Sequence, residues 1–134
     1  MLNKIQTVNS APAFTSRVVI SRKDAEELNC MKDGKNNIDT FRKKLAKDGK
    51  NDVVEIGISS TYNESSSTVL RIYPENSNEY KQVRIYGMWR ESSLDFDKLY
   101  KAALTQDDTT QIDGRFPNVM TGTIDSGVKH IWLG

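Results

Sequence analysis

Three short segments in the middle of the chain alternate apolar and polar residues with the period of two that is typical of β-strands. Their apolar positions are Val54, Ile56 and Ile58, then Leu70 and Ile72, then Val83 and Ile85. A serine-rich loop (residues 59–67) and a loop that starts at Pro74 (residues 74–78) join them. Both loops are too short to hold a crossover helix, so the pattern predicts an antiparallel three-stranded meander.

One pairing of these segments satisfies the alternation throughout. It pairs Glu55 with Arg71, Ile56 with Leu70 and Val54 with Ile72, and then Arg71 with Tyr86, Ile72 with Ile85 and Tyr73 with Arg84. The aliphatic side chains then lie on one face of the sheet, and the Glu, Arg and Tyr side chains lie on the other. A slip of one residue would exchange the two faces, so we expect this register.

Apolar residues at helical spacing predict three helices. Ser21 and Asp24 fit a capping box for the first, which ends near Asp33 and Gly34, and Asn37 can cap the second, which stops at Asp48 and Gly49. Ser92 and Ser93 begin the third, with Asp95 completing another capping box. The apolar stripes are Ala25, Leu28 and Met31; Ile38, Phe41 and Leu45; and Phe96, Leu99, Tyr100 and Ala103.

Two further strands flank this pattern. Residues 17–20 form a β-branched run that predicts a first strand, and residues 130–133, which include Trp132, predict a last strand at the edge of the sheet. Residues 106–126 are mostly polar and predict turns around Asp113-Gly114 and Phe116-Pro117. The expected fold is therefore α+β: an antiparallel sheet, made of the meander and the two terminal strands, with helices on one face and the order β-αα-βββ-α-β.

Length and composition agree with one water-soluble domain. The chain has 134 residues, of which 37% are hydrophobic and 28% charged. We expect residues 17–134 to form a single α+β domain and residues 1–16 to be a mobile leader, either a frayed terminus or an unfolded export signal. The net charge is +1, but residues 1–50 carry eleven Lys/Arg against six Asp/Glu, and the remainder carries eight against twelve. The two parts are therefore expected to attract each other or to form a dipolar surface.

Location and membrane insertion follow from what the sequence lacks. A single cysteine, Cys30, cannot form an internal disulfide, which favours a reducing compartment. No apolar run approaches the ~20 residues that span a bilayer, and the N-terminus lacks the apolar core of a signal peptide. We expect a cytoplasmic protein without membrane insertion, and export by a route independent of a signal peptide stays open.

The polar face of the predicted sheet carries Arg71, Tyr73, Arg84 and Tyr86. Arginine and tyrosine side by side can stack on bases and contact phosphates, as in proteins that bind single-stranded nucleic acid. The same residues can instead form a cross-strand ladder of cation–π contacts and ion pairs, with Glu55 neutralising Arg71. Both interpretations remain open.

A second candidate surface is the basic helix patch: Arg42, Lys43, Lys44, Lys47 and Lys50. These residues could bind phosphates, an acidic protein or an anionic surface. A solvated helix face is the alternative.

Catalytic and metal-binding patterns are weak. His130 is the one histidine, so a Cys–His pair would have to join it to Cys30, and the position of Cys30 beside Met31 predicts a small buried hydrophobic residue instead. One His and one Cys cannot build a usual zinc site, and Asp107, Asp108 and Asp113 lack the spacing of a calcium loop. No catalytic residue, metal site or cofactor is predicted.

Three functions remain. The first is a non-catalytic interaction module that binds another protein, such as a bacterial or viral effector or inhibitor. Its candidate contacts belong to residue types that are common in binding hot spots: Arg71, Tyr73, Arg84, Tyr86, Trp89 and Arg90, with Trp132. The second is a nucleic-acid-binding domain that uses the Arg/Tyr face or the basic helix patch. The third is a small enzyme that gathers His130 with residues distant in sequence.

Overall fold

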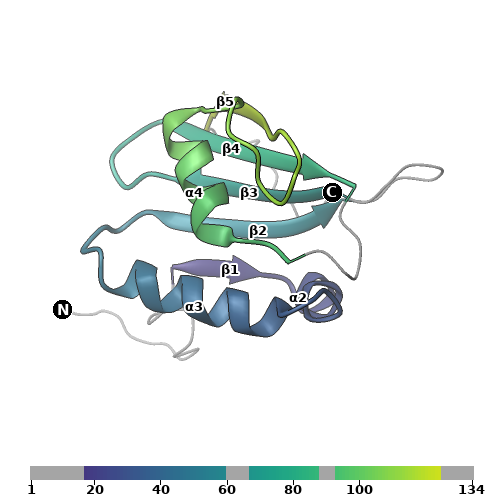
Figure 1. Ribbon diagram of the computed structural model, residues 1–134. Helices are drawn as coiled ribbons and strands as arrows, with labels where there is room; N and C mark the ends of the chain where they lie inside the picture. The colour runs from purple at the N-terminus through teal and green to yellow at the C-terminus, as the bar shows by residue number, and fades with distance from the viewer. Residues whose placement is uncertain (1–16, 60–66, 88–92, 125–134) are drawn as a thin grey trace.

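The described residues of the computed structural model, 17–59, 67–87 and 93–124, form a five-stranded sheet with three helices (Figure 1). The strands lie in chain order across the sheet: β1 (Val18–Ile20), β2 (Val53–Ser59), β3 (Ser67–Tyr73), β4 (Glu79–Tyr86) and β5 (Asn118–Thr123). The α+β class is therefore confirmed. The predicted leader, residues 1–16, lies outside the described residues.

The sheet is mixed, which corrects the antiparallel prediction. β1 runs parallel to β2, with Val18 opposite Val54 and Ile20 opposite Ile56. Two helices, α2 (Arg22–Asn29) and α3 (Gly34–Ala46), lie between these strands along the chain. A helical connection returns the chain to the end of the sheet from which it left, so β2 has the same direction as β1.

The predicted register is correct on one side of β3 and wrong on the other. Glu55 lies opposite Arg71, as predicted, and its neighbours in β2 follow the same pairing. On the other side, Arg71 lies opposite Gln82 and Ser67 lies opposite Tyr86, so the pairing with β4 differs from the prediction by four residues. An even shift leaves every side chain on its predicted face, because neighbouring residues alternate between faces. The alternation predicted the faces and could not distinguish these two pairings.

β5 occupies a stretch for which turns were predicted. It pairs antiparallel with β4, with Arg84 opposite Asn118 and Tyr80 opposite Gly122. The predicted turn at Asp113-Gly114 is present just before it, since both residues have positive φ. The last strand of the described structure thus lies at 118–123, and the segment predicted for that role, 130–133, lies outside the described residues.

Side-chain caps begin two of the helices. Ser21 caps α2 by accepting a hydrogen bond from the Asp24 amide (3.1 Å), as the capping box predicted. Asp95 is itself the N-cap of α4 (Phe96–Thr105), three residues later than the predicted start. The second helix begins at Gly34, and Asn37, its predicted cap, lies inside it.

The three described helices cover one face of the sheet. In Figure 1, α4 lies across the strands, and α3 packs against α4 through Phe41, Phe96 and Tyr100. The core between the layers contains, from the sheet, Val54, Ile56, Leu70, Ile72, Val83 and Ile85 and, from the helices, Leu28, Ile38, Phe41, Leu45, Leu99 and Ala103. These are the predicted aliphatic face and helix stripes, so burial of apolar area explains the arrangement of the layers. None of the described helices is long and apolar enough to cross a membrane.

Gly34 allows the close contact between α2 and α3. A Cβ atom at this position would lie 1.9 Å from the Leu28 carbonyl oxygen and 2.8 Å from its carbon, both of them backbone atoms. The two helices would therefore have to separate, and Gly34→Ala is expected to destabilise the fold by about 1–3 kcal/mol, although alanine favours helices elsewhere. Denaturant unfolding would measure this cost. Lys35→Ala, at an exposed neighbouring position, is the control and should change stability by less than about 0.5 kcal/mol; equal effects of the two substitutions would contradict the argument.

Candidate functional site

Arg71 and Tyr73, two of the predicted contact residues, are engaged in a network on the face of the sheet opposite the described helices. Arg71 donates from Nε and Nη2 to Gln82 Oε1 (3.0 and 2.7 Å) and from Nη1 to the Tyr73 hydroxyl (3.2 Å). That hydroxyl donates to Glu55 Oε1 (2.9 Å), and Glu55 is only 1% exposed. Burial raises the pKa of Tyr73; Arg71 opposes this effect and Glu55 adds to it. The network fits the cross-strand ladder that the sequence offered as one interpretation.

Tyr80 extends this network to the edge of the sheet. Its ring centroid lies 4.3 Å from Arg71 Cζ and 6.0 Å from the Tyr73 ring centroid. The ring also covers Gly122, where an added Cβ would lie 2.3 Å from Tyr80 Cζ. An aromatic side chain packed over a glycine of the neighbouring strand compensates for the missing side chain. Arg71, Tyr73 and Tyr80 thus hold β3, β4 and β5 together.

Arg84 and Tyr86 lie toward the other end of β4, and there the face is more exposed. Arg84 Nη1 donates to Ser67 Oγ (3.2 Å), and Arg84 Cζ lies 5.9 Å from the Tyr86 ring centroid. Tyr86 is 49% exposed, and Phe116, just before β5, is 61% exposed. The β4–β5 pairing ends with Arg84 opposite Asn118, so Tyr86 and Phe116, each two residues from that pair, lie at the same end of the two strands. Large apolar side chains gather here at the surface of the described structure.

Arg115 lies at the same end of the sheet as Tyr86 and Phe116. Its Nε lies 3.4 Å from the position that a Cβ on Gly87 would take, directly after β4. Its Nη1 is hydrogen-bonded to the carbonyl oxygen of Asp113 (3.0 Å) and to its carboxylate (3.3 Å). We call Arg84, Tyr86, Arg115 and Phe116 the end patch. Trp89 and Arg90, also predicted contacts, follow Tyr86 closely in the chain but lie outside the described residues.

The basic helix patch is spread around α3. Lys43 and Lys47 are exposed on the side away from the core, whereas Arg42 lies on one flank, 3.9 Å from Asp39 in a weak ion pair. Lys50 lies beyond the helix, with Nζ 5.9 Å from the Tyr100 ring centroid. The five cationic side chains therefore do not point toward a common site that one phosphate or carboxylate could occupy.

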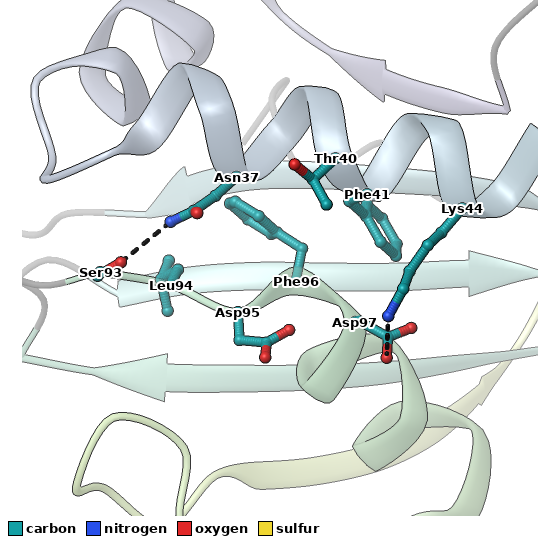
Figure 2. A pocket seen from close by; sticks show the side chains of 9 residues that line it. All are labelled: Asn37, Thr40, Phe41, Lys44, Ser93, Leu94, Asp95, Phe96 and Asp97. Carbon is teal, nitrogen blue, oxygen red and sulfur yellow. Dashed lines mark hydrogen bonds and ion pairs between the residues drawn. The ribbon is translucent and has the colours of Figure 1, made fainter.

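Lys44 faces α4 and closes one end of a cleft of about 310 Å³ (Figure 2). Its Nζ lies 3.2 Å from Asp97 Oδ2, and Lys101 Nζ lies 3.1 Å from the same oxygen. Burial alone would raise the pKa of Asp97, but hydrogen bonds from Lys101 and Lys44 lower it below its ordinary value. At the other end, Asn37 Nδ2 donates to Ser93 Oγ (3.2 Å), and Figure 2 shows both pairs reaching across between the two elements. The ion pair between Lys44 and Asp97 joins the basic helix to the more acidic part of the chain. Such an attraction between the two parts is one of the two expectations from the charge distribution.

A second ionic cluster ties the start of β1 to α3 and α4. The Arg17 guanidinium donates to the carboxylates of Asp48 and Asp52 and to the carbonyl oxygens of Leu45 (2.7 Å) and Asp52 (2.9 Å). The Tyr100 hydroxyl donates to Asp52 Oδ2 (2.7 Å). The hydrogen bond from Arg17 lowers the pKa of Asp48, whereas burial, followed by the hydrogen bond to Asp52, raises that of Tyr100. Each polar group has a partner within the chain, as is typical of a structural cluster.

The residues considered for catalysis are not brought together in the described structure. Cys30 is exposed at the C-terminal end of α2, which corrects the prediction of a buried residue. The helix ends at Asn29, so Cys30 falls after the last turn that packs on the core. His130 lies outside the described residues. Within residues 17–59, 67–87 and 93–124, no three His, Cys, Asp or Glu side chains cluster closely enough to hold a metal ion.

Sequence reasoning missed Arg115, Phe116 and the exposed Met120 of β5. A signal for β5 was present in the sequence, because Val119, Thr121 and Thr123 are β-branched residues at alternating positions.

Comparisons with models of protein families, with curated proteins and with solved structures found no match.

Proposed function

We propose that this domain is a non-catalytic interaction module that binds another protein through the end patch. The observation that carries this proposal is the exposure of Tyr86 and Phe116, 49% and 61%, beside two arginines at one end of the sheet. Aromatic residues and arginine are enriched at the centres of protein interfaces, because they bury a large area and lose little conformational freedom. An incoming apolar surface could cover both rings while the guanidinium groups stay hydrated at the rim.

The predicted contact residues divide between two roles under this proposal. Arg71 and Tyr73 position the strands, since their hydrogen bonds to Gln82 and Glu55 join β3 to β4 and to β2. Arg84 and Tyr86 belong to the contact surface, and Trp89 and Arg90 are its expected continuation along the chain. Substitution of Arg71 would therefore act on the fold, whereas substitution of Tyr86 would act on binding.

Binding of nucleic acid is the less favoured alternative. A platform for single strands needs aromatic rings and cations that are available to bases and phosphates. Here Arg71 lies between Gln82, Tyr73 and Tyr80, and Lys44 is paired with Asp97. We expect no binding that weakens steeply with salt, which is the mark of phosphate contacts.

Photo-crosslinking in the protein's own host cell tests the proposal. With p-benzoylphenylalanine in place of Phe116, we expect an adduct with a protein of defined mass. The same probe in place of Asn36, which is exposed on α3, is the control and should not form that adduct. Tyr86→Ala should reduce the adduct about tenfold or more, which corresponds to the loss of one hot-spot side chain.

The outcomes separate the candidate functions. Lys43→Ala, a change on the exposed side of α3, should leave the Phe116 adduct unchanged. Equal adducts from positions 36 and 116 would show that the end patch has no special role. An adduct that nuclease removes would support the nucleic-acid alternative and contradict the proposal.

A further inference from the structure

β5 forms an edge of the sheet, and its backbone geometry can be derived from one hydrogen bond. The Ile124 amide donates to the carbonyl oxygen of Asn78 (2.7 Å), one residue beyond the paired segment. Hydrogen-bonded positions alternate along an antiparallel pair, so Met120 and Gly122 direct their backbone groups toward β4. Val119, Thr121 and Thr123 therefore direct their N–H and C=O groups away from the sheet.

Within the described residues, this edge lacks the usual features that prevent pairing with another strand. Natural edge strands are blocked by charged side chains, proline, bulges or very short length. β1, at the opposite edge, has three residues, whereas β5 has six, without a charge or a proline. In the described part of the chain, no hydrogen bond reaches the outward backbone groups of Val119, Thr121 and Thr123. The edge can therefore accept another extended strand.

We propose that β5 pairs antiparallel with β5 of a second copy of this chain, around a two-fold axis at Thr121. Val119 of one copy then lies opposite Thr123 of the other, and Thr121 lies opposite Thr121. The three outward positions are symmetric about the axis, so each outward N–H and C=O group of both copies finds a partner. An interface that uses the same surface on both subunits produces a closed dimer, in which the sheets of the two copies form one continuous sheet.

The side chains of β5 fit this pairing. Met120, 44% exposed on the face opposite the described helices, lies opposite Gly122 of the second copy, where the Tyr80 ring takes the place of the missing side chain. The Tyr80 ring that covers Gly122 offers the Met120 thioether of the other copy an aromatic contact. On the helix side, threonine faces threonine or valine, and no charged residue meets its own copy.

These matches favour a second copy over a foreign peptide. Any extended peptide would satisfy the same backbone groups. A peptide of another protein has no reason, however, to place a long side chain opposite Gly122 and a small one opposite Met120, as β5 does for itself. This inference is independent of the end patch, which lies at the end of the strand and is not on the axis.

Sedimentation equilibrium of the full chain, alone in buffer, tests the inference between about 1 μM and about 1 mM. The average mass should rise from 15.2 kDa toward twice that value. Thr121→Lys places two like charges on the axis and should weaken association at least about tenfold. Asn36→Lys adds the same charge on α3 and should associate as the wild type does. A monomer throughout the range, or equal association of all three proteins, overturns the proposal.

Amide hydrogen exchange gives a second readout that does not depend on the variants. At low concentration, the amides of Val119, Thr121 and Thr123 should exchange quickly while those of Met120 and Gly122 are protected. At high concentration, the first three should become protected as well. Protection that does not change with concentration overturns the proposal. None of these results bears on the cross-linking test of the end patch, so the two proposals can fail separately.

Discussion

Asp52→Ala is expected to lower the free energy of unfolding by about 3 kcal/mol, and the melting temperature by roughly 10 °C. The Asp52 side chain is only 8% exposed, and its two oxygens accept from Arg17 and from the Tyr100 hydroxyl. Removing the carboxylate leaves a buried hydroxyl without its acceptor and a guanidinium with one anion instead of two. The cost falls at the lower end of the range for broken buried pairs, because Arg17 keeps Asp48 and two carbonyl oxygens.

Asp48→Ala is the matched control for this prediction. It removes the other carboxylate of the same guanidinium, but the Asp48 side chain is more exposed, at 28%. Water can replace it, so we expect a cost of about 1 kcal/mol or less. Denaturant unfolding of both variants gives the comparison, and equal costs would show that burial of Asp52 is not the cause.

A double-mutant cycle separates the two contacts of Asp52. Tyr100→Phe removes only the hydroxyl that donates to Asp52. If that hydrogen bond contributes as described, the effects of Asp52→Ala and Tyr100→Phe will not add, and the coupling should be about 1 kcal/mol. Additive effects would place the whole cost on the ion pair with Arg17.

Local sequence patterns predicted the layers of this fold better than its connections. The alternation in β2 and β3 predicted their pairing through Glu55 and Arg71. In β4 the same reasoning placed side chains on the correct face but missed the pairing by four residues, because a period of two cannot distinguish even shifts. The direction of β1 could have been predicted from the helices between β1 and β2, since such a connection produces a parallel pair. Chain direction depends on the connection, and alternation contains no information about it.

The candidate sites depend on contacts between distant segments, and the sequence does not display these. Arg17, Asp48, Asp52 and Tyr100 come from three separate segments: the start of β1, the loop between α3 and β2, and α4. No spacing pattern links these segments. Arg71 and Tyr73 matched a nucleic-acid platform by residue type, but the pairing with Gln82 and the ring of Tyr80 decides where their polar groups point. Phe116 was assigned to a turn, whereas the turn lies at Asp113 and Gly114 and Phe116 follows it. Only the β4–β5 pairing shows that Phe116 lies at the same end of these strands as Tyr86.

Phe41→Ala is expected to cost about 3–5 kcal/mol of unfolding free energy. Phe41 is 2% exposed on α3, with its ring centroid 6.1 Å from that of Phe96 and 5.8 Å from that of Tyr100. Truncation would remove these aromatic contacts, which join α3 to α4, and would leave a cavity that two packed helices can fill only in part. Phe41→Leu keeps most of the volume and should cost less than about 1.5 kcal/mol.

Phe116→Ala completes the comparison, because it makes the same chemical change at a site that is 61% exposed. We expect a change in stability within about 0.5 kcal/mol, since little packing is lost. Partner binding should be affected although stability is not: the Phe116→Ala variant should fold normally yet no longer bind the protein partner, because that ring is part of the end patch. The exposed ring would then have its role in recognition and the buried ring in stability. A Phe116 variant that is as unstable as Phe41→Ala would show that the end patch is packed within the domain, and it would remove the basis for binding there.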